Sequence, residues 1–205
     1  MTASVSSPTD AVNIALRKIG YKLRVGSLYE GSLAAKNALD LYAQTRDQLL
    51  RQNDWGFAER NLAMTLQKSA PVGGYIPPVT WNPNTNPPIP WRFQYARPTD
   101  CLKIRSVKPT PLFVPEYDPQ PHVFGEANDT TLTPPAQVIL CNVANALLVY
   151  TGQIVDLTSW EADTIETFID ALAERLAPSL ASMQAAQMIT AQAVGSKQTA
   201  EMEQG

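Results

Sequence analysis

The prolines of this chain are concentrated in its middle. Fifteen of the seventeen lie between Pro71 and Pro135. Proline has no backbone N–H and a fixed φ, so it interrupts helices and central strands alike. The sequence therefore predicts helices toward the two ends of the chain, with strands and irregular loops between them.

This distribution indicates a fold class and two domains. The fold is expected to be α+β, with a bundle of about four helices and a small antiparallel β domain that carries a long proline-rich loop. The bundle is expected to comprise residues 1–54 and 157–205. The β domain is expected to comprise residues 55–156, and its proline-rich arm residues 69–90.

Local capping signals predict the first two helices. Ser7, followed by a proline and then by an acid three positions on, indicates a helix over 8–19. Ser27, with a glutamate three residues later, is a second start signal that leads into a helix from about residue 31 to residue 52. Arg46 lies in the apolar stripe of that helix, where it either pairs with an acid or stays at a solvated edge.

The apolar pattern near the other end predicts two more helices. A helix is expected to begin near Ser159, because apolar residues recur at helical spacing from Ile165 to Leu176. Pro178 removes a backbone donor, so a kink or break is expected there. A weaker fourth helix is expected from residue 179 to about residue 194.

Alternating apolar residues predict the strands of the β domain. The aromatic strand 91–95 is expected to turn at 98–100 into a partner strand at 102–105. Residues 137–142 and 146–151 resemble the two strands of a hairpin.

The arm predicts a contact with another protein. It holds seven prolines, and long loops without secondary structure are commonly either binding elements or disordered segments. Its large apolar side chains are costly to leave in water, which favours a partner-contacting arm. The predicted partner-interface residues are Tyr75, Ile76, Trp81 and Ile89 on the arm and Met188 and Ile189 further along the chain.

The residue types predict no catalytic, cofactor or metal site. His122 is the only histidine and has no nucleophile and acid placed around it in a recognisable pattern. No glycine-rich phosphate loop is present. Glu161 and Asp163 lie at a helix start, where acids usually serve capping and the helix dipole. We therefore expect no enzymatic activity, no cofactor and no bound metal.

Charge and cysteine content exclude further classes. The formal net charge of -3 disfavours a DNA-reading domain. Lys103 and Arg105 alternate beside the aromatic strand, a pattern known from single-stranded nucleic-acid binding, but an aromatic core face with a solvated opposite face is favoured. Cys101 and Cys141 have no zinc-binding spacing and are expected to be reduced thiols.

The sequence predicts no membrane span and no secretory signal. No apolar run reaches the roughly 18 residues that a bilayer helix needs, and the first ten residues lack the basic and apolar segments of a signal peptide. The protein is expected to be made in the cytoplasm.

Six segments follow one another in a recognisable order. They are NIALRKIG (13–20), SLYEGSLAA (27–35), RDQLLRQNDWGFA (46–58), WRFQYARPTDCLKIRSV (91–107), LVYTGQIVD (148–156) and FIDALAERLAPSLA (168–181). Together they resemble the head-to-tail adaptor (connector) proteins of tailed bacteriophages, the family that includes tail tubular protein A. The motif residues are Arg46, Trp55, Phe57, Trp91, Tyr95 and Asp100.

The resemblance implies a structural protein of the virion neck or tail, made in the host cytoplasm. Such adaptors form a ring, usually of twelve copies, beneath the portal, where they extend the DNA channel and serve as a platform for tail attachment. The helix bundle would form the ring. The implied partners are further copies of the chain, the portal protein and a tail nozzle or tail tube protein. Double-stranded DNA would pass through the channel without specific binding, and no membrane is involved.

Two other functions stay open at the level of sequence. One is a different neck or tail completion module, which would not bind the portal directly. The other is a tail-associated wall hydrolase, which would need two carboxylates such as Glu161 and Asp163 in a sugar-sized cleft.

Overall fold

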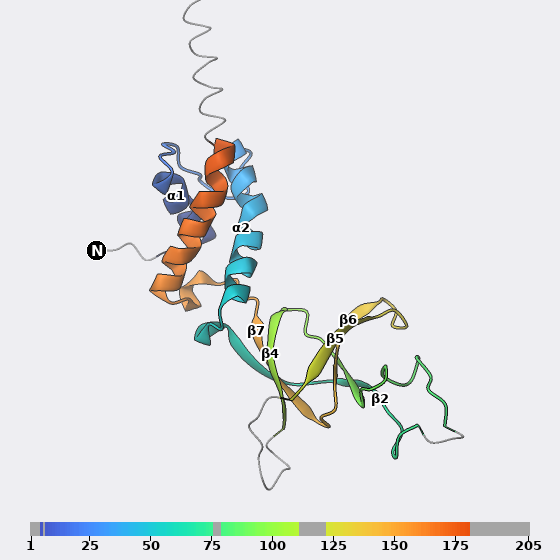
Figure 1. The fold of residues 1–205 in the computed structure, drawn as a ribbon. Coiled ribbons are helices and arrows are strands. Elements are labelled where there is room, and N and C mark those ends of the chain that lie inside the picture. Colours follow the sequence, from blue (N-terminus) through green and yellow to red (C-terminus); the bar gives the residue numbers. More distant parts are fainter. Residues whose placement is uncertain (1–4, 6, 76–78, 111–121, 181–205) are drawn as a thin grey trace, which may run out of the picture. The chain divides into compact units, whose positions relative to one another are not determined.

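The structure is a computed structural model, and it describes residues 5, 7–75, 79–110 and 122–180 of the chain. The chain divides into two compact units. The first comprises Met1–Leu49 and Ile154–Gly205, and the second comprises Leu50–Gln153. In Figure 1 the helices are coloured blue to cyan and orange, and the strands green to yellow-orange.

The first unit begins with helix α1, Pro8–Lys18. Its N-terminus forms as the capping signal predicts, because Ser7 Oγ accepts a hydrogen bond from Asp10 N at 3.1 Å. The same hydroxyl donates to the Asp10 carboxylate at 2.7 Å. The serine side chain thereby satisfies one of the backbone N–H groups that a helix start leaves without an intrahelical partner.

Helix α2, Leu33–Gln52, begins two residues later than expected. Its first turn is capped by Ser32, whose Oγ accepts a hydrogen bond from Ala35 N at 3.3 Å. The expected cap, Ser27, belongs to a turn outside the helix, where Glu30 Oε2 accepts from the Ser27 backbone N–H at 3.3 Å. Both serines fit a capping pattern, and the sequence signal selected the wrong one.

A third α-helix spans residues 162–180. The expected break at Pro178 is wrong, because this residue lies within the helix. Proline keeps φ in the helical range and costs mainly one hydrogen bond, while Leu176 and Leu180 on either side are buried and hold the helix in place. Most of the expected fourth helix, residues 181–194, lies outside the described residues.

The loop after α1 is held by a buried asparagine. Asn13 Nδ2 donates to Val25 O at 2.9 Å, and Val25 N donates to Asn13 Oδ1 at 2.9 Å. Asn13 is only 5% exposed and Val25 is buried. This reciprocal pair of hydrogen bonds resembles the pairing between two strands, although no strand forms here. It fixes the path of the loop.

Replacing Asn13 with alanine is expected to lower the free energy of unfolding by about 2–3 kcal/mol, because both backbone groups of Val25 lose a buried partner. Chemical denaturation followed by circular dichroism measures this. The control is Gln44→Ala on the exposed side of α2, expected to stay within about 0.5 kcal/mol of the parent. Equal stabilities of the two variants would contradict the role given to Asn13.

The described part of the second unit has a short 3-10 turn, Gly56–Ala58 (η1), followed by seven strands. The strands are β1 (Glu59–Ala63), β2 (Leu66–Ser69), β3 (Phe93–Ala96), β4 (Cys101–Pro109), β5 (Phe124–Asp129), β6 (Ala136–Cys141) and β7 (Ala146–Gly152). A second 3-10 turn, Leu157–Ser159 (η3), follows in the first unit. All strand pairs are antiparallel, in one sheet of order β1-β7-β4 and one of order β2-β3-β6-β5.

Strands β3, β4, β6 and β7 lie close to their predicted positions, but their predicted pairing was wrong. Strands β3 and β4 were expected to pair with each other, but β3 pairs with β2 and β6 while β4 pairs with β7. Strands β6 and β7 were expected to form a hairpin, but β6 pairs with β3 and β5 while β7 pairs with β1 and β4. In both cases the turn carries the chain from one sheet to the other.

One apolar core lies between the two sheets. Its buried members come from both, and the largest is Tyr95 of β3, whose hydroxyl donates to Val143 O at 2.8 Å. The other buried members are Met64, Cys101, Ile104, Val107, Ile139, Cys141, Ala146, Leu148 and Tyr150. Strands β3, β4, β6 and β7 contribute its buried strand residues, which explains why the apolar pattern identified these four strands.

The expected fold class needs correction. The described chain has three α-helices and two antiparallel sheets with seven strands, rather than about four helices and a small β domain. The overall class is still mixed α+β. The strand content was underestimated because β5 is only partly buried and has no strong alternating pattern.

Candidate interaction surfaces

The proline-rich arm connects β2 and β3, and its described residues form turns rather than strands or helices. Trp81 Nε1 donates to Pro87 O at 2.8 Å, and Asn86 N donates to Asn82 O at 2.8 Å. Asn86 Nδ2 also donates to Ser69 O at 3.1 Å, at the end of β2. The arm is therefore tied both to itself and to the sheet.

A buried lysine of β2, Lys68, binds the proline-rich arm. Lys68 Nζ lies 2.5 Å from Asp129 Oδ2, 2.7 Å from Thr131 Oγ1 and 2.8 Å from Pro83 O. The side chains of Lys68 and Asp129 are only 6% and 8% exposed. Gln94 Nε2 completes the cluster by donating to Asp129 Oδ2 at 2.6 Å. A lysine in β2 thus fixes a carbonyl fifteen residues away on the arm.

The environment of Asp129 strongly favours its charged form. Burial by itself raises the pKa of this carboxyl, but the hydrogen bonds from Lys68, Gln94 and Thr131 outweigh burial and hold the pKa well below its ordinary value of 3.8. The cluster is therefore an ion pair at neutral pH.

A pocket of about 420 Å³ lies where the arm leaves and rejoins the sheet. Its walls are Ala70, Pro71, Gly73, Gly74, Tyr75, Ile89, Pro90, Trp91 and Arg92. The two wall segments run together, because Ala70 N donates to Arg92 O at 2.7 Å. Gly73 and Gly74 have φ of 90° and 85°, a region that favours glycine, and their turn shapes one wall.

Three of the predicted partner-interface residues lie on this part of the molecule. Tyr75 is half-buried in the pocket wall, Trp81 is exposed on the arm, and Ile89 is 65% exposed at the pocket rim. Ile76, Met188 and Ile189 lie outside the described residues. Whether any of the six contacts a partner stays a prediction.

The six motif residues do not form one site. Arg46, in the first unit, is buried, and its Nε lies 2.8 Å from Asp47 Oδ1, which settles its state as paired rather than solvated. The other five belong to the second unit. Trp55 and Phe57 have ring centroids 6.2 Å apart.

Asp100 is part of a polar contact at the end of the β1-β7-β4 sheet. Its carboxylate accepts a hydrogen bond from Tyr150 Oη at 3.1 Å and lies 3.6 Å from Arg60 Nε. Burial, with the negative charge of Asp100 next in importance, raises the pKa of Tyr150 to about 12. These groups support the sheet.

Two of the three basic residues of β4, Lys103 and Arg105, are occupied by contacts within the second unit. Arg105 Nη1 lies 3.0 Å from Glu59 Oε2, and Arg105 Nη2 donates to Trp55 O at 2.6 Å. Lys103 Nζ lies 2.8 Å from Asp54 Oδ1. A nucleic-acid surface needs cations that are available to phosphates, so this strand offers little support for one.

The first unit carries exposed apolar side chains that sequence reasoning missed. Leu23 is 69% exposed and Tyr29 is 86% exposed in the loop between α1 and α2, and Leu33 at the start of α2 is also exposed. The same loop is fixed by Asn13 and by the buried Leu28. We call Leu23, Tyr29 and Leu33 the α1–α2 patch. The only indication of this patch in the sequence is that Leu23 and Tyr29 lie outside the apolar stripes of the predicted helices.

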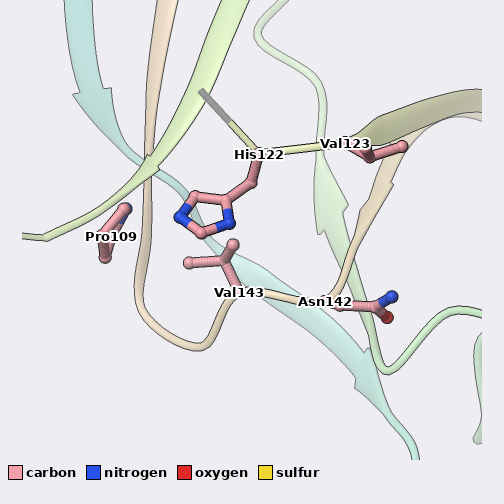
Figure 2. Close-up of a pocket in the computed structure, with 5 residues that line it drawn as sticks. All are labelled: Pro109, His122, Val123, Asn142 and Val143. Carbon is pink, nitrogen blue, oxygen red and sulfur yellow. The ribbon is translucent and has the colours of Figure 1, made fainter. Parts of the chain in front are cut away.

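The described residues show no constellation for catalysis or metal binding. No group of three or more histidines, cysteines and acids that could hold a metal is found among them. His122 lines a second pocket, of about 410 Å³, with Pro109, Val123, Asn142 and Val143. Figure 2 shows its imidazole between Pro109 and Val143, and none of the described residues that line this pocket is an acid, serine or cysteine.

The two cysteines are buried and are not joined in a disulfide. Burial raises the pKa of both thiols, so both are neutral and poorly nucleophilic at physiological pH. Within the described ranges no helix combines the length and apolar character that crossing a membrane requires.

Comparison with known proteins finds no family model and no curated protein that matches this sequence.

Proposed function

We propose that this protein is a head-to-tail adaptor of a tailed bacteriophage. In this role it forms a ring of about twelve copies beneath the portal, extends the DNA channel and provides the platform on which the tail nozzle or tail tube assembles. Its function is structural and not enzymatic, and it works in the neck of the virion.

The observation that carries the proposal is the presence of exposed apolar side chains on well-fixed loops of both units. Tyr29 and Leu23 lie on a loop held by the Asn13 hydrogen bonds, and Ile89 and Trp81 lie on the arm anchored by Lys68. Holding apolar side chains rigidly in water is costly for a monomer and natural for a subunit whose neighbours cover them. The six segments that resemble the adaptor family, and their order in the sequence, are the reason for proposing this particular function.

Two different surfaces also suit a ring. A closed ring with one kind of subunit needs a head-to-tail interface, in which one surface of a subunit meets a different surface of the next. The α1–α2 patch has the basic residues Lys22 and Arg24 next to its apolar ones in the sequence, whereas the third helix exposes Asp163 and Glu174 and is preceded by the exposed Glu161. Opposite charges of this kind favour association between neighbouring copies.

The decisive experiment measures the mass of the purified protein by light scattering, alone and mixed with the cognate portal protein, followed by electron microscopy of the mixture. The expected result is a particle whose mass is a multiple of 22.4 kDa and which stacks coaxially on the portal. A protein that never associates with the portal would overturn the adaptor role.

The α1–α2 patch gives a sharper prediction. Leu23→Asp combined with Tyr29→Asp is expected to abolish ring formation, because two charges then replace the apolar contacts, while the melting temperature changes little since both side chains are exposed. The matched control is Val123→Asp, also strongly exposed but in the second unit. Rings formed by the double variant at the parental protein concentration would remove the patch from the interface.

A further inference from the structure

The arm pocket has the chemistry of a site for an extended, proline-containing peptide. We propose that the pocket walled by Tyr75, Trp91, Pro71 and Pro90 binds a short proline-rich segment of a partner protein that also carries an acidic residue. The inference rests on the proposed function in one respect, namely that the arm contacts a partner, and it names the chemistry of that contact.

The pocket presents two aromatic residues on a rigid base. Trp91 packs against β5 so closely that a Cβ added to Gly125 would lie 3.0 Å from Trp91 Cζ2, and Trp91 N donates to Pro88 O at 2.9 Å. Tyr75 stands in the opposing segment of the wall. Proline-rich segments bind in aromatic-lined grooves because their extended helix is already formed and loses little entropy.

The hydroxyl of Tyr75 supplies the polar element. It is shielded from solvent and finds no hydrogen-bond partner among the described residues. A buried polar group without a partner is unfavourable. Since the hydroxyl is shielded, a ligand reaches it only if the phenol turns toward the pocket, and the missing hydrogen bond favours that turn. A peptide carbonyl is the acceptor that a proline-rich segment offers in place of N–H groups.

Arg92 selects for negative charge. It is the only charged residue among those that line the pocket, and no carboxylate lies within 4.0 Å of it in the part of the chain that the structure describes. Its guanidinium carbon lies 5.8 Å from the centroid of the Phe93 ring, which holds the cation at the rim. One cation beside an apolar pocket suits an acidic side chain next to prolines, whereas a nucleic acid needs a cationic groove along its whole backbone.

The size of the pocket agrees with such a ligand. About 420 Å³ is in the range of ordinary small-ligand sites. It holds one or two proline rings and leaves the remainder of the peptide along the arm.

The test uses the full-length protein and a synthetic peptide of seven residues, Pro-Pro-Ala-Pro-Glu-Pro-Pro, blocked at both ends. Binding is followed by tryptophan fluorescence and by chemical shift changes of the indole N–H groups. Two further peptides serve as comparisons, one with lysine in place of glutamate and one with alanine in place of every proline. The expected order of affinity is the acidic peptide first, the lysine peptide second and the alanine peptide last.

Point variants assign the binding to this pocket. Tyr75→Phe and Arg92→Gln are each expected to weaken the acidic peptide about three- to tenfold, since each removes one hydrogen bond or charge contact. Trp91→Ala is expected to abolish detectable binding. Arg17→Gln, a change at an exposed arginine of the first unit, is the control and leaves the affinity unchanged.

Three results would overturn the inference: no binding at millimolar peptide, equal binding of the alanine peptide, or affinities that Tyr75→Phe and Arg92→Gln leave at the parental value. None of them touches the adaptor role, which is decided by the light-scattering mass with the portal. Conversely, if the protein does not bind the portal but still binds the peptide, the peptide site is supported and the adaptor role is overturned.

Discussion

Replacing Lys68 with methionine is expected to lower the free energy of unfolding of the second unit by about 3–5 kcal/mol, because Asp129 then stays buried without its cation. The change also removes the contact with Pro83 O, which leaves the Asn86–Ser69 hydrogen bond as a remaining tie between the arm and β2. Urea denaturation followed by tryptophan fluorescence measures the loss.

A matched control separates burial from charge. Lys103→Met breaks an ion pair with Asp54 in the same unit, but both partners are exposed, so the expected loss is below about 1 kcal/mol. A second variant tests the mechanism, since Lys68→Met together with Asp129→Leu removes both buried charges and is expected to recover much of the loss. Equal losses from Lys68→Met and Lys103→Met would show that the cluster has no special role.

The same cluster predicts an acid sensitivity. The pKa of Asp129 is lower in the folded protein than its ordinary value of 3.8, so its ionised form adds stability that is complete above that value. This contribution falls as the pH decreases below 3.8 toward the folded-state pKa. Stability curves between neutral and acidic pH should therefore be flatter for Asp129→Asn, although that variant is less stable at neutral pH. A steeper acid loss in the variant would contradict the assignment.

The features that could be predicted from sequence are those fixed by neighbouring residues. The start of α1 depends on Ser7 and Asp10, three positions apart, and it formed as expected. The places of β3, β4, β6 and β7 follow from alternating apolar residues that face one core. Strand pairing failed because a turn such as 143–145 shows where the chain reverses but not whether the next strand joins the same sheet.

The candidate surfaces also differ in whether neighbouring residues in the sequence could predict them. The arm was predicted because prolines exclude regular structure and its apolar residues stand out. Its anchor could not be predicted, since the partners Lys68 and Asp129 are 61 residues apart and Lys68 looks like an ordinary exposed lysine. The α1–α2 patch was missed for a related reason, because the path of the loop that carries Leu23 is fixed by hydrogen bonds between Asn13 and Val25, twelve residues apart. Such contacts exist only once the fold has formed.

The first unit depends most on Phe168, and Phe168→Ala is expected to lower its free energy of unfolding by about 3–5 kcal/mol. The side chain is fully buried, with ring centroids 5.1 Å from Tyr42 and 5.6 Å from Trp160, so its loss leaves a cavity among large rings. Hydrogen exchange with mass spectrometry is the measurement, because it reports each unit separately. Peptides from residues 33–49 and 162–180 should lose protection, whereas the β6 and β7 peptides should keep theirs.

The control for this variant is Thr167→Ala, the exposed neighbour on the same helix, which is expected to change protection by less than about 0.5 kcal/mol. The proposed ring also depends on the first unit, since the α1–α2 patch and the acidic helix face both lie there. Phe168→Ala should therefore weaken assembly while leaving peptide binding by the arm pocket at the parental affinity. Loss of protection in β6 and β7 to the same extent as in the helices would contradict this division, because the two units would then unfold as one.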